Sequence, residues 1–233
     1  MARGLPRSRQ WYRYVVMEYS TGLSLPPAVR AAALDALGTS ELRHELAWMS
    51  WAGTVWRLEA ESRSVYVKRA ADLAGERDRL QWLDSRWPVP KPIGLYRAFG
   101  DDWLLTHAVV GAPLSDRSIA WSAARMAAFM GETLRNLHAV DATGCPFGEA
   151  RPGHVLMHGD YCMPNVLVHA DQLSAVVDVG QSGLGDPSID LAAGVWTLQY
   201  NFGPGHAREF LDAYGAARMT DAAIERVRRK YAR

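Results

Sequence analysis

A change in residue pattern near position 110 limits the possible folds of this chain more than any other feature. Between about residues 49 and 109 the pattern predicts strand, strand, helix, strand, strand, because apolar and polar residues alternate in two short hairpins. After Gly111 the apolar residues recur at helical spacing, along a long helix that ends near His138. We therefore predict an α+β fold of two lobes, a small antiparallel-sheet lobe and a mainly helical lobe, with a cleft that holds a ligand.

Turn residues and prolines set the bounds of the elements in the sheet lobe. The first hairpin joins apolar runs at Val55–Leu58 and Val65–Val67 through a turn at Glu61–Arg63. The second hairpin turns at Gly100–Asp101, and the helix between the two hairpins is stopped by Pro88. The other expected elements are a short helix within Leu25–Leu42, strands in HVLMH, NVLVH and LSAVVD, and helices over Asp190–Tyr200, His206–Gly215 and Asp221–Tyr231.

These elements divide the chain into a basic leader over residues 1–24, a sheet lobe over 25–109 and a helical lobe over 110–233. The leader lacks the apolar segment of a secretory signal. We interpret it as disordered, or as the product of an early start codon with Met17 as the true start, in preference to a transit peptide.

The composition is typical of a globular cytoplasmic protein. The chain has 26 Lys and Arg and 25 Asp and Glu, which gives a net charge of +1. This balance argues against a protein whose whole surface binds a polyanion. Cys145 and Cys162 are too few for a disulfide framework, which favours a reducing compartment. No apolar run approaches the ~20 residues of a membrane helix. We therefore expect a cytoplasmic protein without a nucleic-acid or membrane partner.

Polar residues with the chemistry of phosphoryl transfer gather in the second half of the chain. The segment HGDYCMPN carries Asp160 and Asn165 five residues apart, and Asp178 follows thirteen residues later at the end of LSAVVD. Because two strands joined by a turn connect these residues, we expect their side chains to meet at one end of a small hairpin. A carboxylate can take the proton of an attacking hydroxyl, and hard oxygen ligands hold Mg²⁺ against nucleotide phosphates. The pattern matches the catalytic loop and the metal-binding Asp of kinases.

The run from Gly180 to Asp190 has mainly structural roles by its composition. Its glycines allow a close approach of the backbone. Asp186 or Ser188 can cap the helix that begins near Ile189, and we expect Asp190 to brace the loop or favour the helix dipole. Cys162, in the loop itself, is interpreted as packing, since direct phosphoryl transfer needs no nucleophilic thiol.

HGDYCMPN and the later VVDVGQSGLGDPSIDLA together resemble the signature of the aminoglycoside phosphotransferases, especially the branch that modifies the 3′-hydroxyl of kanamycin-type drugs. The resemblance continues through VYVKR, ERDRLQWL, PVPKP, DWLLTHAVVG and LHAVDATGCPF, and covers about Leu42 to Tyr231. It implies a protein-kinase-like fold with ATP and Mg²⁺ as cofactors. It also implies that Asp160 is the catalytic base position and that Asn165 and Asp178 are the magnesium ligands.

The same resemblance implies a nucleotide site in the sheet lobe. Lys68 would grip the α- and β-phosphates while paired with Glu76, and Ser50 is the candidate phosphate contact in the loop MSWAG. Tyr66 matches an aromatic position that stacks on adenine. The segment Thr106–Val109 matches the hinge whose backbone groups, here at Ala108 and Val109, bind adenine.

The sequence departs from the family pattern where the drug binds. Only ten residues separate Phe147 from His158, where family members carry a longer segment that supplies acidic side chains. The chain ends in a basic run instead of an acidic, aromatic tail, and Gln181 replaces a common arginine. A polycationic drug needs carboxylates in a partly dry pocket. The acidic residues that could compensate are Glu149, Asp186 and Glu209.

We expect an ATP- and Mg²⁺-dependent phosphotransferase that phosphorylates a hydroxyl of a small polar molecule, with an aminoglycoside as the leading substrate and drug inactivation as the role. Alternatives are a kinase for another small alcohol and a truncated, non-catalytic nucleotide-binding relative. Two further alternatives are weaker. His154, His158 and His169 suggest zinc but lack a ligand motif. The basic segment IERVRRKYAR is more typical of a solvated helix face than of a nucleic-acid contact.

Overall fold

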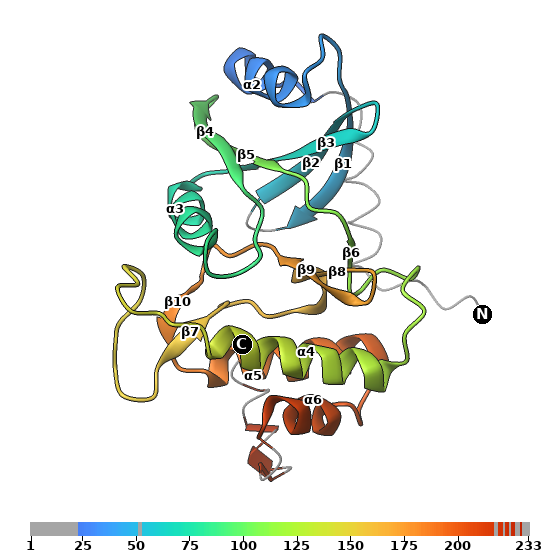
Figure 1. The fold of residues 1–233 in the computed structure, drawn as a ribbon, viewed down its shortest axis with the longest axis vertical. Coiled ribbons are helices and arrows are strands. Elements are labelled where there is room, and N and C mark those ends of the chain that lie inside the picture. The colour runs from blue at the N-terminus through green and yellow to red at the C-terminus, as the bar shows by residue number, and fades with distance from the viewer. Residues whose placement is uncertain are drawn as a thin grey trace, which may run out of the picture. The chain divides into compact units, whose positions relative to one another are not determined.

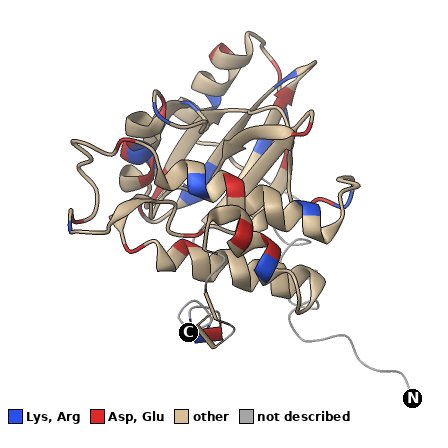
Figure 2. Cartoon of the chain, turned by 60° about the horizontal axis from the view of Figure 1, so that its bottom comes forward, with Lys and Arg blue, Asp and Glu red and all other residues tan. Residues whose placement is uncertain are grey.

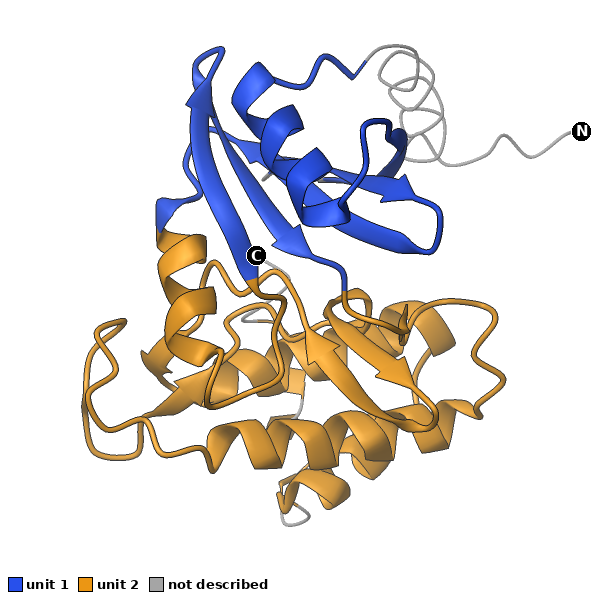
Figure 3. Ribbon diagram, turned by 45° about the horizontal axis from the view of Figure 1, so that its top comes forward, with its two compact units in different colours: residues 1–74, 92–108 blue, residues 75–91, 109–233 orange. Residues whose placement is uncertain are grey.

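The structure is a computed structural model that describes residues 23–50, 53–216, 219–220, 222–223, 225–226 and 229. It divides into two compact units (Figure 3). Unit 1 consists of residues 1–74 and 92–108, and unit 2 of residues 75–91 and 109–233. Residues 75–91, which the sequence assigned to the sheet lobe, therefore cluster with the helical unit. The mixture of antiparallel sheet and helices confirms the α+β fold class (Figure 1).

Unit 1 is a five-stranded antiparallel sheet in the order β1-β2-β3-β5-β4 with one helix. Its elements are α2 (Pro27–Leu37), β1 (Arg43–Ser50), β2 (Gly53–Ala60), β3 (Arg63–Ala70), β4 (Pro92–Ala98) and β5 (Asp101–His107). The predicted hairpins β2–β3 and β4–β5 are confirmed. Strand β1 was not predicted, and a register shift between Leu46 and Trp48 interrupts its pairing with β2. Helix α2 is shorter than predicted because Gly38 ends it in a left-handed conformation, φ 63°.

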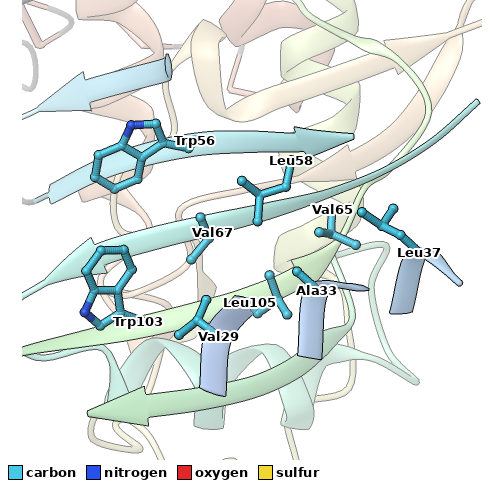
Figure 4. Packing of buried hydrophobic residues seen from close by; sticks show 9 residues of the cluster. All are labelled: Val29, Ala33, Leu37, Trp56, Leu58, Val65, Val67, Trp103 and Leu105. Carbon is cyan, nitrogen blue, oxygen red and sulfur yellow. The ribbon is translucent and has the colours of Figure 1, made fainter. Parts of the chain in front are cut away.

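One face of this sheet forms the core of unit 1, because alternate residues of a strand point to the same side. Strands β2, β3 and β5 each place two apolar side chains under α2 (Figure 4). The buried cluster consists of Val29, Ala33, Leu37, Trp56, Leu58, Val65, Val67, Trp103 and Leu105. Since Val65 and Val67 face α2, Tyr66 and Lys68 point to the opposite face of the sheet.

Unit 2 combines helices with two small antiparallel sheets, β6-β8-β9 and β10-β7. Its helices are α3 (Ala74–Leu83), α4 (Ala123–His138), η1 (Met163–Asn165), α5 (Ser188–Phe202) and α6 (Ala207–Tyr214). Its strands are β6 (Ala112–Pro113), β7 (Val155–Met157), β8 (Val166–His169), β9 (Gln172–Val176) and β10 (Gly183–Gly185). The predicted strands in HVLMH, NVLVH and LSAVVD are confirmed, while β6 and β10 were not predicted. Helix α3 ends at Leu83, five residues before the predicted stop at Pro88.

Helix α4 is the central helix of unit 2 and contacts both β7 and α6 (Figure 1). Ser122 caps it, since the Ser122 hydroxyl accepts the amide of Arg125 at 3.2 Å. Glycines allow α6 to approach closely: a Cβ at Gly131 of α4 would collide with the backbone oxygen of Phe210, and one at Gly194 of α5 with the Phe210 ring. The long helix predicted to end near His138 is confirmed.

Several predictions fall on residues outside the described part of the chain. These are the leader up to residue 22, the loop residues 51–52, and most of the predicted helix Asp221–Tyr231 with the basic segment at its end. Over the described chain, basic and acidic residues are interspersed (Figure 2). None of the described helices is both long and apolar enough to cross a membrane.

Candidate active site

The loop that carries the sequence signature connects β7 to β8 and folds back on itself. It ends in the short helix η1. The side-chain amide of Asn165, the last residue of η1, donates to the backbone oxygen of Asp160 at 2.9 Å and to the Asp160 carboxylate at 3.1 Å. The five-residue spacing therefore closes a compact loop that brings two of the predicted site residues into direct contact.

Asp178 lies just beyond the strand that pairs with β8. Strand β9 ends at Val176, two residues earlier than the sequence suggested, and Asp178 has a left-handed backbone with φ 60°. The amide of Val177 donates to the backbone oxygen of Asn165 at 3.0 Å. The residue before Asp178 is therefore bonded directly to the loop over residues 158–165, at the hairpin end where we expected the oxygen-bearing side chains to gather.

A buried histidine adds a second link between the loop and the segment before Asp178. His158 Nδ1 accepts the amide of Asp160 at 3.2 Å, so the ring proton is on Nε2. Nε2 donates to the backbone oxygen of Val177 at 3.0 Å. Because both ring nitrogens have partners, His158 fixes the spacing between Asp160 and the segment that carries Asp178.

Asp190 of α5 braces the loop through its backbone. Its fully buried carboxylate accepts the amide of His158 at 2.7 Å and the amide of Gly159 at 2.8 Å. Hydrogen bonds to an ionised acceptor are shorter and stronger than neutral ones. The bracing role expected for Asp190 is confirmed. The predicted cap of α5 is wrong: the N-cap residue is Pro187, which has no side-chain cap bond, and Ser188 is already helical. Asp186 instead closes the turn before the helix, where its carboxylate accepts the amide of Ser188 at 2.9 Å.

Gly159 is required by the geometry of the loop. Its φ of 89° is unfavourable for other residues, and a Cβ at this position would lie 2.6 Å from the backbone oxygen of Gln181. The glycine therefore allows the loop over residues 158–165 to approach the segment that follows Asp178. Gln181 contributes its backbone oxygen and its Cβ to this contact.

The residues after Asp160 are buried and hold the loop from inside. Tyr161 is fully buried, its hydroxyl donates to the backbone oxygen of Met130 at 2.9 Å, and burial raises its pKa well above the usual value. Cys162 is 7% exposed, which confirms its interpretation as packing. In addition, the thiol of Cys162 donates to the Asp160 carboxylate at 3.4 Å. Asn165 and Cys162 thus contact different oxygens of Asp160.

The sequence did not identify Arg79 of α3 as a structural residue. Its Nε donates to the backbone oxygen of Ser182 at 2.6 Å, and its guanidinium lies 4.5 Å from the centre of the Phe147 ring. On the same helix, Glu76 lies beside Gly180, where an added Cβ would be 3.5 Å from its carboxylate. Helix α3 thus contacts the glycine-rich run after Asp178. In the sequence, the only sign of this contact is the charge-rich run ERDRLQWL. Such runs usually face solvent, so the contact was not predicted.

The predicted nucleotide contacts fall in both units. Tyr66 and Lys68 lie on β3 of unit 1, and Ala108 N donates to the backbone oxygen of Ser64 at 3.3 Å. Glu76 and Val109 belong to unit 2, so the boundary between the units falls within the predicted hinge. Ser50 is the last residue of β1, where it pairs with Gly53 across the predicted loop.

Two of the three acidic residues that could bind a cationic substrate lie beside β10. The amide of Glu149 donates to the backbone oxygen of Leu184 at 3.3 Å, and Asp186 directly follows the strand. Both are exposed, and Glu149 forms an ion pair with Arg151 at 2.6 Å. Glu209 instead lies on α6, which packs on α4 and α5.

The three histidines considered for zinc do not form a common site. His154 Nδ1 lies 2.7 Å from the backbone oxygen of Glu149, and His158 uses both ring nitrogens within the protein. Strand β7 separates His154 from His158. In the described part of the chain, no three His, Cys, Asp or Glu side chains are placed to hold a metal ion. The proposed magnesium ligands, Asn165 and Asp178, are not such a group, because Asn165 would bind through its amide oxygen.

Comparison with known proteins identifies the family. The model of the phosphotransferase enzyme family matches residues 47–153 and 149–229, which together include the loop over residues 158–165 and Asp178. The chain belongs to this family. The aminoglycoside 3′-phosphotransferase of Niallia circulans is 26% identical to this chain, in an alignment that covers 61% of this chain and 71% of the relative. The resemblance inferred from the sequence motifs is thereby confirmed.

Solved structures agree with this assignment. A crystal structure of the type VIII aminoglycoside 3′-phosphotransferase matches with a TM-score of 0.68 and 26% identity, over 85% of this chain and 96% of that chain. An aminoglycoside phosphotransferase in a ternary complex with AMP-PNP and hygromycin B matches with a TM-score of 0.57 and 12% identity, over 89% and 95% of the two chains. The predicted protein-kinase-like fold is confirmed.

Proposed function

We propose that this protein transfers the γ-phosphoryl group of ATP, with Mg²⁺, to a hydroxyl of a small polar molecule, and that the substrate is an aminoglycoside inactivated in the cytoplasm. The observation that carries the proposal is the contact of the Asn165 amide with the Asp160 carboxylate at 3.1 Å, beside the hairpin end that carries Asp178. Membership of the phosphotransferase enzyme family supports the reaction class.

The donor set fits magnesium. Since the amide nitrogen of Asn165 donates to Asp160, its side-chain oxygen is the atom that remains for a metal ion. With the Asp178 carboxylate it provides hard oxygen ligands, which Mg²⁺ prefers. When bound, the ion would neutralise charge on the phosphates during transfer.

Asp160 is the proposed base. Its carboxylate is held by Asn165 through one oxygen and by Cys162 through the other, so its orientation is set before substrate binds. It would accept the proton of the substrate hydroxyl and keep that oxygen in line with the phosphoryl group. Positioning of this kind provides most of the catalysis in phosphoryl transfer.

Unit 1 and the hinge would hold the nucleotide. We propose that Lys68 binds the α- and β-phosphates with Glu76 as its partner, that Ser50 contacts phosphate, and that Tyr66 stacks on adenine. The backbone groups of Ala108 and Val109 would complete the adenine contacts. The face of the sheet opposite α2, where Tyr66 and Lys68 point and are partly buried, supports this assignment.

Substrate identity rests on the similarity to aminoglycoside 3′-phosphotransferases and on acidic residues near β10. Glu149 and Asp186 would bind ammonium groups, because a polycation needs carboxylates to replace its hydration. The short connection between Phe147 and His158 favours a second candidate, a kinase for another small alcohol.

A panel of acceptors tests the proposed function. ATP consumption is measured with kanamycin, neomycin, streptomycin, a macrolide and choline, each with and without Mg²⁺. We expect Mg²⁺-dependent turnover with kanamycin or neomycin. Turnover with choline or the macrolide alone would identify another alcohol kinase. Tight ATP binding without turnover on any acceptor would identify a non-catalytic relative.

A further inference from the structure

A line of three side chains connects helix α6 to the catalytic loop. The hydroxyl of Tyr214, the last residue of α6, lies 2.9 Å from His138 Nδ1 at the end of α4. His138 Nε2 lies 3.1 Å from the Asp190 carboxylate of α5. The same carboxylate oxygen accepts the amide of His158, and the second oxygen accepts the amide of Gly159. Tyr214 is therefore connected to the loop through two intermediate side chains.

Burial determines how these hydrogen bonds are directed. The side chains of His138 and Asp190 are 4% and 0% exposed, so a missing partner would not be replaced by water. A carboxylate can only accept, so His138 Nε2 carries a proton and donates to Asp190. His138 Nδ1 then accepts from Tyr214. Burial and the nearby Asp190 charge raise the pKa of Tyr214, which keeps the hydroxyl protonated as this bond requires.

Helix α6 holds Tyr214 firmly in this position. Phe210, one turn earlier, packs against the glycines of α4 and α5 described above. The rings of His138 and Tyr214 meet edge to face with centres 5.5 Å apart. Arg135, one turn before His138, donates to the backbone oxygen of Ala213 at 3.0 Å on the exposed side of the same helix pair.

We propose that His138 and Tyr214 are positioning residues for phosphoryl transfer, which fix the Asp190 carboxylate and through it the backbone of the loop that carries Asp160. This inference rests on the proposed function for its catalytic consequence. The hydrogen bonds of His138 and Tyr214 connect them to each other and to Asp190, and none of these bonds involves the Asp160 side chain. Their effect on the reaction is therefore indirect.

The proposal predicts a specific pattern of effects. Without the Tyr214 hydroxyl, His138 Nδ1 loses its partner and the ring is held less firmly in the orientation that donates to Asp190. The amides of His158 and Gly159 would then exchange with solvent more readily, and the Asp160 carboxylate would be less well oriented. Turnover should fall, whereas the KM for ATP should change little, because the nucleotide contacts are elsewhere.

The central experiment compares Tyr214→Phe with Arg135→Met. Both remove one bond between α4 and α6, but only the first bond leads to Asp190. For Tyr214→Phe we expect kcat to fall about fivefold and amide exchange at residues 158 and 159 to rise about fivefold, the effect of one buried hydrogen bond. For Arg135→Met we expect both quantities to stay within about twofold of wild type. Thermal unfolding of both variants separates local from global effects.

Substitutions at His138 provide the conservative rescue. Gln can place an amide donor near the position of Nε2, whereas Leu cannot donate at all. We expect His138→Gln to keep more of kcat and of the amide protection than His138→Leu. If His138→Leu fails to fold, His138→Gln and Tyr214→Phe still decide the question, since both keep the volume of the buried side chain close to the original.

Several results would overturn the proposal. If amide exchange at residues 158 and 159 is unchanged in Tyr214→Phe, the proposal is refuted regardless of kcat. It is also refuted if amide exchange rises while kcat stays unchanged. Equal losses in Tyr214→Phe and Arg135→Met would indicate general stability instead of positioning. A wild-type protein inactive on every acceptor would refute the proposed function, while the exchange data would still decide whether Tyr214 orders the loop.

Discussion

The side-chain amide of Asn165 donates to the carboxylate of Asp160 at 3.1 Å, so the proposed metal ligand and the proposed base are in direct contact. The amide nitrogen orients the base, and the amide oxygen is available to the metal ion. Asn165 would therefore take part in both proposed roles, metal binding and orientation of the base. A change at Asn165 should affect both.

Substitution of Asn165 tests this double role. In Asn165→Ala we expect the Mg²⁺ concentration for half-maximal rate to rise about tenfold or more, because one oxygen ligand is lost. Saturating Mg²⁺ should not restore kcat fully, because Asp160 also loses its amide donor. The measurement is the phosphorylation rate as a function of Mg²⁺ concentration. Asp178→Ala is the comparison variant, because it removes the other proposed ligand and leaves the contact between Asn165 and Asp160 in place. A Mg²⁺ dependence identical to wild type would rule out Asn165 as a ligand.

Two glycines with similar backbones separate backbone strain from crowding. Gly159 has φ 89° and an added Cβ would contact Gln181, whereas Gly153 has φ 81° and open space around it. We expect Gly153→Ala to cost about 1 kcal/mol of unfolding free energy from the left-handed backbone. Gly159→Ala should cost at least about 1 kcal/mol more, because the segment after Asp178 must move. Chemical denaturation of both variants measures the difference, and equal losses would contradict a crowded loop.

Cys162 distinguishes direct transfer from a covalent route. Its thiol contacts Asp160 but is buried, and direct phosphoryl transfer does not use it. We expect Cys162→Ala to keep kcat within about fivefold of wild type, since the thiol hydrogen bond to Asp160 is long and weak. Thiol labelling should modify the partly exposed Cys145 before Cys162. A loss of several orders of magnitude in Cys162→Ala would contradict a role limited to packing and a weak hydrogen bond.

The sequence predicted the parts of the fold in which local pattern and tertiary contact agree. The β2–β3 hairpin alternates cleanly and its turn lies where predicted, whereas β1 was missed because its register shift after Leu46 breaks the alternation. The contact of Asp160 with Asn165 was predictable because it spans one short loop. The bond of His138 to Asp190 was not, since 52 residues separate them and each residue is ordinary on its own helix.

The turn between β8 and β9 provides a prediction of pH dependence. Hydrogen bonds from Arg125 and from the Trp121 indole lower the pKa of Asp171 below its usual value. A lowered native pKa means that this carboxylate stabilises the fold above its unfolded pKa, and that the contribution is lost as the pH falls through the native pKa. We expect Arg125→Met to raise the pKa of Asp171 toward the usual value, as measured by NMR titration of its carboxyl carbon. An unchanged titration would mean that Arg125 does not pair with Asp171 in solution.

In the proposed mechanism, the Asp160 carboxylate is the central group, because it positions the acceptor hydroxyl. The most direct measurement is mass spectrometry of kanamycin after incubation with ATP, Mg²⁺ and either the wild-type protein or Asp160→Ala, with ATP affinity measured in parallel. We predict that the wild type adds one phosphoryl group to the drug, and that Asp160→Ala does so about 10²–10⁴ times more slowly, as expected for loss of a general base. ATP should bind both proteins about equally. Equal rates of drug phosphorylation by the two proteins would contradict the mechanism.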